Sequence, residues 1–490
     1  MKALGFVGLV AAVLAAGDAA VAQEFEIRSA APEVWARRDA IVRTVTNSAA
    51  EVASRVARLS SEGRTVSLAE FQDRVTVRNG QTVWDAALEA ALESAQVVVF
   101  PPQDEPYYLD RTVVIPGGRR LVATGATVAK LPKSADAMFV NAGAVSGRFA
   151  PAVRGASDRT ICLEGGTWSS WCTARIESPQ SGRVFLNGED QGDGGNAMMY
   201  FSNVDGLMMK DLRFVRSGGF AVQVGDSENL VFERIEFRDC NSDGIHVNGG
   251  IRRLLCRDIS GRVGDDLVAL NACDWEGRST LNWGPIEDVL CERIRAVGGC
   301  PWFRILPGVH RYSGADGKRN GLTADCPINR IVLRELSGIS EIKMYLQPMM
   351  HAVGEMPDRD AVGTGRDWFV EDSEIALRGA WSPTGKLDEW GHVGSVELCS
   401  DVDGLHFRNL RLAGCPAESD FEHFLVIGPK SARSGDGKSE FFCPYYSCAV
   451  TNVTFDAVTV VSGVAPKRLV HTVTPARFPG AEPCSKSDGQ

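Results

Sequence analysis

Residues 228–271 read ENLVFERIEFRDCNSDGIHVNGGIRRLLCRDISGRVGDDLVALN and contain a repeated spacing of apolar residues. Leu230, Phe232 and Ile235 follow the pattern Φ-x-Φ-x-x-Φ, in which Φ is apolar and x is any residue. The i, i+2 spacing is that of a β-strand, and the third apolar residue follows a bend. The same triplet recurs at Leu207/Met209/Leu212, Leu254/Cys256/Ile259, Val289/Cys291/Ile294, Ile331/Leu333/Leu336, Leu405/Phe407/Leu410 and Val453/Phe455/Val458.

The distances between these copies indicate a solenoid. The first offsets are 23 and 24 residues, and the later ones are 35, 42, 74 and 48. A unit this short cannot bury its apolar side alone, but stacked copies share one core. We therefore predict an all-β parallel β-helix, with the extra length in loops such as 273–285 and 308–327. A leucine-rich horseshoe is less favoured because helical segments between the strands are missing. One column of core residues is then formed by Met209, Phe232, Cys256, Cys291 and Leu333.

The chain before the first copy has a different pattern. Helical periodicity covers residues 32–60 and returns at 82–92, followed by a buried strand that ends at Pro101-Pro102. A helix over the open end of a β-helix would protect its exposed first coil. We divide the chain into a signal peptide at 1–22, a helical segment at 23–79, a β-helix at 80–475 and a polar tail at 476–490.

The amino-terminal residues are typical of a secretory signal. Lys2 is followed by an apolar run from Ala3 to Ala16, and Ala20-Val21-Ala22 precedes Gln23,. This run is too short to span a membrane, and no later segment is apolar over about 18 residues. The sequence thus predicts a soluble protein that is secreted or periplasmic.

Composition excludes some partners and leaves disulfides open. The net charge is -10, from 52 basic and 62 acidic residues, which argues against nucleic acid as a partner,. Thirteen cysteines in an exported chain are compatible with disulfides, and the odd number leaves at least one outside any intrachain pair,. Without a matched set of CxxC pairs, the sequence does not favour a zinc site.

Two acidic motifs lie within the opening stretch, at Asn241-Ser242-Asp243-Gly244 and Gly264-Asp265-Asp266. Asp243 and Asp265 are 22 residues apart, close to one repeat, so they would lie side by side on neighbouring coils. Facing carboxyl groups can divide acid and base roles between them. The structural alternative is that they are turn residues, as Asp205 and Asp403 are before their glycines. Adjacent like charges at Asp265 and Asp266 favour the catalytic interpretation, because such charges raise carboxyl pKa values.

An alignment of strands 244–247 and 267–270 predicts which side chains share a face. Neighbouring strands lie about 4.8 Å apart, so side chains on one face of adjacent coils can converge. Asp266 and His246 would share the outer surface, with Asp243 and Asp265 at its corner. The alignment places Ile245/Leu267 and Val247/Ala269 inward, and Gly244/Asp266 and His246/Val268 outward.

The helix at 82–92, the strand that follows it and residues 107–127 resemble the entry of the pectate-lyase-like right-handed parallel β-helix superfamily. Within that superfamily, NSDG followed one coil later by GDDLVALN resembles the polygalacturonase family of glycoside hydrolases (family 28). The fold-level resemblance covers residues 80–470, and the family-level resemblance covers mainly 241–271. It implies a single-stranded right-handed parallel β-helix with an N-terminal capping helix.

The resemblance also implies catalytic roles. Asp265 would be the general acid that protonates the leaving oxygen, and Asp243 and Asp266 would activate the attacking water. The family inverts the anomeric centre, which needs acid and base roughly 6.5–9.5 Å apart, and requires no metal or other cofactor. The family's Gly-His-Gly after the double Asp and its later Arg-Ile-Lys are both missing here. The resemblance therefore does not establish a galacturonate substrate.

Further residues are candidates for binding substrate. Arg304 and Lys343 fall on comparable strands and would substitute for the missing basic residues; the alternative is that they are surface cations. His246 would replace the missing histidine, or is a packed strand residue.

Three tryptophans lie near these positions in the sequence. Trp275 and Trp283 are in the insertion after the GDD strand, and Trp302 lies one coil on. Aromatic faces near a glycan site can stack on sugar rings, although loop tryptophans also pack onto their own scaffold.

These observations predict an exported glycoside hydrolase that cleaves a pectin-like or related polysaccharide by an inverting mechanism, with neither nucleic acid nor membrane as a partner. One alternative is a polysaccharide lyase or epimerase that uses His246, a lysine or an arginine as base on a uronate, often with calcium. The acidic cluster offers too few ligands to favour calcium. The other alternative is a non-catalytic glycan-binding adhesin, which the fold does not exclude.

Overall fold

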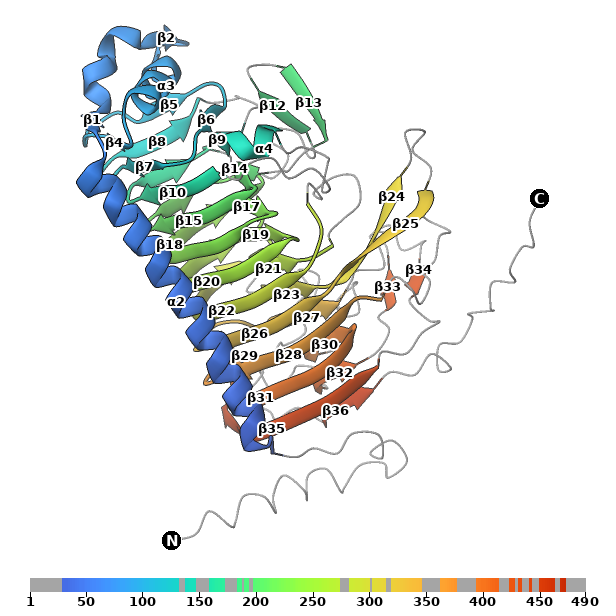
Figure 1. The fold of residues 1–490 in the computed structure, drawn as a ribbon. Coiled ribbons are helices and arrows are strands. Elements are labelled where there is room, and N and C mark those ends of the chain that lie inside the picture. Colours follow the sequence, from blue (N-terminus) through green and yellow to red (C-terminus); the bar gives the residue numbers. More distant parts are fainter. Residues whose placement is uncertain are drawn as a thin grey trace, which may run out of the picture.

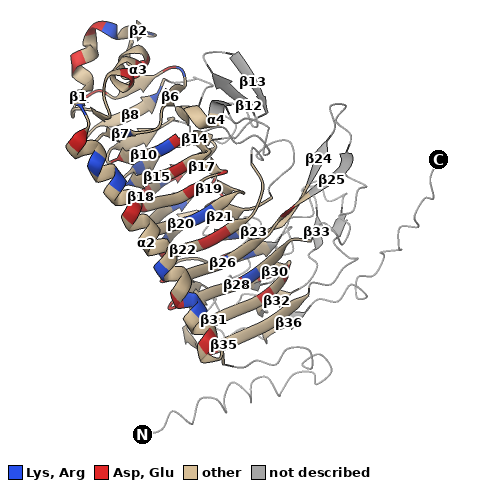
Figure 2. Ribbon diagram, in the orientation of Figure 1, with Lys and Arg blue, Asp and Glu red and all other residues tan. Residues whose placement is uncertain are grey.

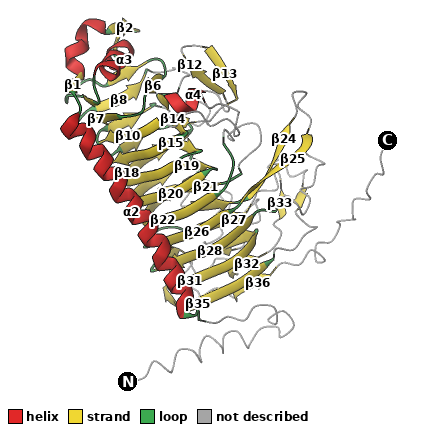
Figure 3. Ribbon diagram, viewed as in Figure 1, coloured by secondary structure: helices red, strands yellow, loops and turns green. Residues whose placement is uncertain are grey.

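The chain forms one stack of strands with a long helix along its flank (Figures 1 and 3). The computed structural model describes residues 29–131, 137–146, 158–171, 183–186, 189–193, 197–273, 282–299, 302–313, 319–345, 362–376, 394–413, 423–427, 431–433, 440–442, 449–462 and 468–472. The predicted signal peptide and polar tail lie outside these residues.

The fold is a right-handed parallel β-helix, as predicted. Its coils are built from three strips of parallel strands, two of which belong to one bent sheet. The first strip contains β1 (Thr65–Ser67), β4 (Val97–Val99), β7 (Arg119–Val122), β10 (Asp158–Glu164), β15 (Val204–Lys210), β18 (Glu228–Cys240), β20 (Ile251–Val263), β22 (Ile286–Gly299), β26 (Ile328–Arg334), β28 (Thr364–Glu371), β31 (Asp401–Ala413) and β35 (Val450–Ser462).

The second strip continues around the corner of the same sheet. It contains β3 (Gln81–Val83), β5 (Tyr107–Leu109), β8 (Thr127–Lys130), β11 (Thr167–Ser169), β16 (Arg213–Val215), β29 (Glu374–Ala376) and the later halves of the long strands.

The third strip is a separate sheet, here called sheet B, and it carries the candidate site. Sheet B contains β6 (Val113–Ile115), β9 (Phe139–Asn141), β14 (Ala197–Ser202), β17 (Phe220–Gly225), β19 (Ile245–Asn248), β21 (Asp266–Asn271), β23 (Trp302–Leu306), β27 (Glu341–Tyr345), β30 (Gly394–Cys399), β32 (His423–Ile427) and β36 (Arg468–Thr472).

The bend inside each triplet is produced by one residue with positive φ. Arg234 separates Phe232 from Ile235 and has φ 53°. Such a conformation is uncommon outside glycine, and here it recurs because each coil turns at the same place. The residues at this corner are Asp211, Arg234, Asp258, Arg293, Glu335, Asp372, Asn409 and Ala457.

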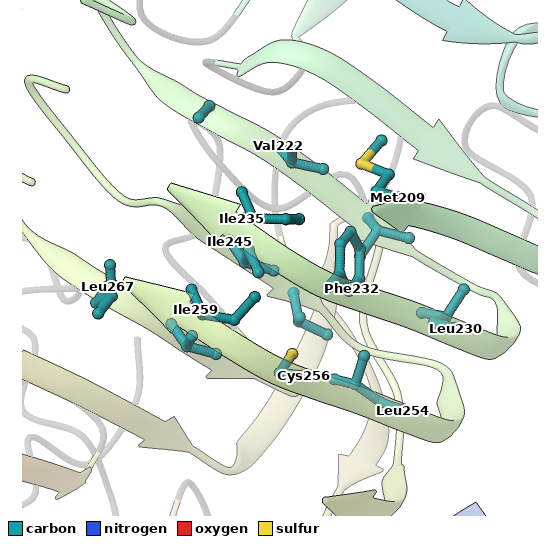
Figure 4. Close-up of a cluster of buried hydrophobic side chains, with 14 of the residues drawn as sticks. Met209, Val222, Leu230, Phe232, Ile235, Ile245, Leu254, Cys256, Ile259 and Leu267 are labelled. Carbon is teal, nitrogen blue, oxygen red and sulfur yellow. The ribbon is translucent and has the colours of Figure 1, made fainter. Parts of the chain in front are cut away.

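The inward residues of successive coils stack in register to form one core. Figure 4 shows Met209, Phe232 and Cys256 lying one above another between the strands. Cys256 pairs with Cys291, which pairs with Leu333, so the predicted column is confirmed. Both cysteines are fully buried.

One coil escaped the sequence pattern. Trp368 of β28 pairs with Ile331 on one side and with Leu405 on the other, so the 74-residue offset contains an additional coil. Its third position is Ser373, whose hydroxyl accepts a hydrogen bond from the N–H of Leu336 at 3.0 Å. Because Ser373 is polar, this coil does not match the pattern of three apolar residues.

The predicted loop at 308–327 is wrong. This segment contains an antiparallel hairpin of β24 (Gly308–Ser313) and β25 (Arg319–Cys326), which extends beyond the stack (Figure 1). Other antiparallel pairs are formed by β2 (Thr76–Arg78) with β3, β12 (Arg183–Leu186) with β13 (Glu189–Asp193), and β33 (Ser431–Arg433) with β34 (Glu440–Phe442).

The predicted capping helix is α3 (Asp85–Ser94), at the amino-terminal end of the stack. Ala87, Leu88, Ala91 and Leu92 are buried in the core of the first coils. The 3-10 helix η1 (Leu68–Arg74) packs beside α3, and a short helix α4 (Ala142–Ser146) follows β9. The domain boundaries stay a prediction; β1 pairs with β4, so a strand of the sheet already lies before residue 80.

The long helix α2 (Pro32–Glu62) lies along the outside of the stack and runs opposite to the order of the coils (Figure 1). Near its start the N–H of Ala30 donates to Asp456 of the last coil at 3.2 Å, and further along Arg55 pairs with Asp205 at 2.9 Å. The helix covers an apolar stripe on the outer face of the first strip. The stripe is Cys162, Met208, Val231, Leu255, Leu290, Val332 and Phe369, and the helix buries Ile41, Val45, Val52 and Val56 against it.

A column of alternating charges runs beside this stripe, at the residue that follows each inward pair of the triplet. Figure 2 shows acidic and basic residues interspersed along α2 and the adjacent coils. In register from coil to coil, the charge column reads Glu164, Lys210, Glu233, Arg257, Glu292, Arg334, Glu371, Arg408 and Asp456. Because the charges alternate, residues of the column on neighbouring coils attract each other. A change in the register of the strands would lose this attraction.

Within the described part of the chain, no helix combines the length and apolar character needed to cross a membrane.

Candidate active site

Asp243 lies in the turn between β18 and β19 and is buried. Its Oδ2 lies 2.6 Å from Nδ1 of His246, and its Oδ1 accepts the N–H of Asp266 at 3.3 Å. The next residue, Gly244, has no room for a side chain, since a Cβ would lie 2.6 Å from the carbonyl oxygen of Leu267. The turn therefore packs directly on the following coil and links Asp243 to the strand that begins with Asp266.

Asp265 and Asp266 stand at the start of β21, where the strand contains a bulge. Asp266 pairs with Trp302, yet Val268 pairs with Phe303, so β21 has one residue more than β23 over this interval. A bulge re-aims the side chains beside it and is common next to functional sites. It keeps Asp266 on the side of the sheet that carries Arg304 and Lys343.

The predicted alignment of the two strands was wrong by one residue. Ile245 pairs with Val268 and His246 pairs with Ala269. Val268 belongs to the core, whereas Ala269 occupies the row of His246 and Arg304. The predicted alignment used the 22-residue spacing of Asp243 and Asp265, whereas the two strands pair at an offset of 23 residues, as in Ile245 with Val268. A shift of one residue exchanges the two faces of a strand.

The structure brings the three predicted acids together. One carboxylate oxygen from each of Asp243, Asp265 and Asp266 lies within 4.8 Å of the other two. Their surroundings differ, because the side chain of Asp265 is 23% exposed whereas that of Asp266 is 1% exposed. The cluster thus has one acid that solvent reaches and two that the protein encloses.

Two cations from the next coils contact this cluster. Nε of Arg304 lies 2.6 Å from Oδ2 of Asp266, and Nζ of Lys343 lies 3.2 Å from its Oδ1. The same cations lie 3.4 Å and 3.7 Å from Oδ1 of Asp265. They stack in register, since Ala269 pairs with Arg304 and Arg304 with Lys343. Both are buried, so the alternative that they are surface cations is wrong.

Burial controls the protonation of the enclosed groups. It raises the pKa of Asp266 to about 7, against the opposing effect of Arg304 and Lys343, and the charges of Asp265 and Asp243 add to the rise,. Burial also lowers the pKa of Lys343, but Asp266 and Asp265 outweigh this effect and raise it overall. Asp266 can therefore gain or lose a proton near neutral pH while Lys343 stays charged.

His246 is fixed on three sides. Its ring stacks on Phe220 with centroids 3.7 Å apart, and its Nδ1 faces Asp243. Its Nε2 lies 3.2 Å from the amide nitrogen of Asn248 and 3.4 Å from that of Asn271. Because amide N–H groups donate to Nε2, this network places the ring proton on Nδ1, where it is shared with Asp243. His246 thus orients Asp243, and its role as a substrate ligand stays a prediction.

Trp302 and Trp283 have partners within the protein. Nζ of Lys343 lies 3.5 Å from the ring centroid of Trp302, a cation–π contact that fixes both side chains,. Trp283 stacks on His310 at 3.7 Å and packs against the core. Trp275 lies outside the described residues. Stacking on a sugar ring stays a prediction for Trp302.

The sequence interpretation missed Glu341 and Phe220. Glu341 is fully buried, shares the row of Trp302, and its charge helps to raise the pKa of Lys343. The signal was the stretch Glu341-Ile342-Lys343, in which alternation puts both charged residues on the outer face of one strand.

The site does not favour calcium. The three carboxylates bring one ligand atom each to a common point, whereas calcium takes six to eight oxygens,. Arg304 and Lys343 already supply positive charge to two of these carboxylates.

Comparisons with known proteins add structural likeness only. No protein-family model matches the chain, and no curated protein matches its sequence significantly. Among solved structures it is similar to the Streptococcus pneumoniae surface protein and adhesin PfbA, with 12% identity, a TM-score of 0.39, and coverage of 83% of this chain and 100% of that one.

Two further solved structures are complexes with sugars. The catalytic domain of a GH87 α-1,3-glucanase in complex with nigerose is 9% identical, with a TM-score of 0.41 and coverage of 80% of this chain and 66% of that one. The tailspike of E. coli bacteriophage HK620 in complex with a pentasaccharide is 12% identical, with a TM-score of 0.41 and coverage of 74% and 65%. At this level of similarity the function has to be argued from the site itself.

Proposed function

We propose that this chain is an exported glycoside hydrolase whose catalytic groups are Asp243, Asp265 and Asp266. The observation that carries the proposal is the cluster itself. Three carboxylates from two neighbouring coils lie within 4.8 Å of one another and have different surroundings. Groups whose surroundings push their pKa values apart are suited to act as acid and base in one reaction.

Asp265 is proposed as the proton donor to the leaving oxygen. It is the exposed member of the cluster, and a general acid must come within hydrogen-bond distance of the atom that it protonates,. Arg304 and Lys343 contact the same oxygen of Asp265 and limit its orientation.

Asp243 and Asp266 are proposed to activate the attacking water. His246 holds one oxygen of Asp243, and Arg304 and Lys343 hold both oxygens of Asp266. Fixed carboxylates avoid reorganisation during the reaction. The pKa of about 7 lets Asp266 take up a proton from the water and release it near neutral pH.

The same contacts bear on the substrate. Arg304 and Lys343 are buried and already paired with Asp266, which supports a role in holding the acids rather than a sugar carboxylate. The proposed substrate is therefore a glycan whose recognition does not depend on these two cations.

The stereochemical outcome is part of the test. An inverting pair is usually roughly 6.5–9.5 Å apart and a retaining pair roughly 5–5.5 Å. The nearest oxygens of the three acids lie within 4.8 Å, which supports the compact arrangement more than the open one. The inverting mechanism implied by the family resemblance stays a prediction, and the anomer released first decides it.

The experiment is to incubate the purified protein with a panel of neutral and acidic polysaccharides. A hydrolase releases reducing ends without ultraviolet absorbance, and Asp265→Asn should lose nearly all of that turnover while remaining folded. Asp403→Asn is the control, because it removes the charge of another aspartate, which bonds to Thr451 and Asn452 away from the site. Unsaturated absorbing products, binding without cleavage, or full turnover by Asp265→Asn would each contradict the proposal.

A further inference from the structure

Two cysteines meet where the β24–β25 hairpin joins the stack, one coil beyond the acids. Cys273 follows β21, the strand that begins with Asp266, and Cys326 is the last residue of β25. The N–H of Cys273 donates to the carbonyl oxygen of Leu306 at 3.4 Å, and Cys326 pairs with Gly308 in the hairpin. Both cysteines therefore anchor to the short segment from Leu306, the last residue of β23, to Gly308, and both are buried.

The two thiols are in hydrogen-bond contact. The thiol of Cys273 donates to the sulfur of Cys326, and this bond is the main reason that the pKa of Cys326 is lowered; burial opposes the shift. The N–H groups of His310 and Gly284 also stabilise the negative sulfur. A thiolate is the form of cysteine that attacks a disulfide, so this pair is arranged for exchange chemistry.

A second cysteine pair in the chain has the opposite character. Cys256 and Cys291 are in register on adjacent core strands and their thiols are also in contact. Burial raises the pKa of Cys291, and the pair is enclosed by the apolar column of Phe232 and Leu333. Contact alone is thus common to both pairs, whereas stabilisation of the thiolate is found at Cys326.

We propose that Cys273 and Cys326 form a disulfide bond that fastens the β24–β25 hairpin to the coil carrying Asp265 and Asp266. The proposal rests on the placement of the two thiols and does not require the proposed hydrolase activity.

The chemistry is thiol–disulfide exchange with a small-molecule disulfide or a disulfide-bonded oxidoreductase. The Cys326 thiolate attacks the donor disulfide, forms a mixed disulfide and releases one donor thiol. Cys273 then loses its proton and attacks the sulfur of Cys326, and the second donor thiol leaves. Two protein thiols lose two protons and two electrons, and the donor disulfide gains them as two thiols.

The first test needs no variant. The full chain, produced in an oxidising compartment, is denatured without reductant, alkylated with iodoacetamide, digested and analysed by mass spectrometry. A peptide pair joined through Cys273 and Cys326 and lacking two hydrogens is expected, with Cys256 and Cys291 alkylated as internal controls. Alkylation of both Cys273 and Cys326 in most molecules, or a bond from either to another cysteine, would overturn the proposal.

The second test measures what the bond does to stability. The bond closes a loop of about 50 residues, so reduction of the wild-type protein should lower its Tm by roughly 5 °C. The double variant Cys273→Ser/Cys326→Ser should show no response to reductant, whereas Cys256→Ser should respond as the wild type does. An equal response of the double variant would show that the stabilising bond lies elsewhere.

Discussion

Charged residues on neighbouring coils are arranged in opposite ways in two regions of this molecule. In the charge column beside α2, acids and bases alternate from coil to coil, and Glu292 lies between Arg257 and Arg334. In the site on sheet B, Asp243, Asp265 and Asp266 gather on two neighbouring coils and their cations come from the two coils after that.

The comparison of Glu292 with Asp266 shows how neighbouring charges set the pKa of a buried carboxyl group. In the column, Arg334 and Arg257 overcome the effect of burial and hold the pKa of Glu292 below its ordinary value. In the site, burial and the neighbouring acids raise the pKa of Asp266 to about 7 although two cations touch it. Like charges on adjacent strands are unfavourable, so the grouping of three acids at this position supports the catalytic role that we propose for it.

The largest effect on stability is expected for Glu292→Gln in the charge column. The substitution leaves Arg257 and Arg334 without their shared buried carboxylate, which should lower the free energy of unfolding by about 3 kcal/mol. Glu236→Gln is the matched control, because Glu236 also lies between two arginines, Arg213 and Arg238, but at the surface. Its cost should stay below about 1 kcal/mol in urea unfolding. An equal loss in the free energy of unfolding for the two variants would show that burial of the carboxylate makes no difference.

Lys343→Met tests the same comparison at the site on sheet B. Lys343 opposes the rise in the pKa of Asp266, so its removal should move the pH-rate limb that Asp266 controls to higher pH. Turnover should fall about 100-fold because a buried charge of the site is lost. Lys210→Met, which removes a lysine of the charge column, serves as the control and should leave the pH-rate profile unchanged. An unchanged pH-rate profile in Lys343→Met would show that Lys343 does not influence the pKa of Asp266.

A smaller effect is expected from Glu371, a buried residue of the charge column that pairs with Arg38 of α2. Burial raises its pKa to about 7, with Arg38 opposing the rise. A raised pKa contributes stability that is complete below the ordinary value of 4.5 and is lost as pH rises through about 7,. Glu371 should therefore account for a loss of about 2 kcal/mol between roughly pH 5.5 and 8.5, and Glu371→Gln should remove that part of the slope.

Asp266 contributes a pH dependence of the same sign, so Glu371→Gln should retain part of the slope. Urea unfolding at several pH values measures both parts. A wild-type protein that becomes more stable as pH rises through 7 would contradict the raised pKa values of both groups.

Most of the fold could be predicted because inward residues repeat with the spacing of a strand. The coil with Ser373 in the third position was missed, since only the first two positions of its triplet are apolar. The docking of α2 could also have been predicted from the sequence. Leu230-Val231-Phe232 and Ile331-Val332-Leu333 are apolar at all three positions, so both faces of these strands are apolar. A strand with both faces apolar is covered on both sides.

The site could be predicted in its membership but not in its register. Asp243, Asp265 and Asp266 follow from motif spacing, and Arg304 and Lys343 follow from their places on later strands. Val268 and Ala269 were exchanged because the strands were aligned on the 22-residue spacing of the acids, whereas β19 and β21 pair at an offset of 23. Contacts such as that between His246 and Phe220 required the fold of two coils to be known.

The central claim is that the acid cluster serves chemistry and adds no stability. The most direct test measures turnover and the free energy of unfolding on the same preparation of Asp265→Asn. Turnover should fall by about 10³-fold or more, as expected for loss of a general acid, while the free energy of unfolding stays unchanged or rises because repulsion with Asp266 is removed. Retained turnover, or a loss of stability comparable to that of Glu292→Gln, would show that Asp265 is one more paired charge of the scaffold.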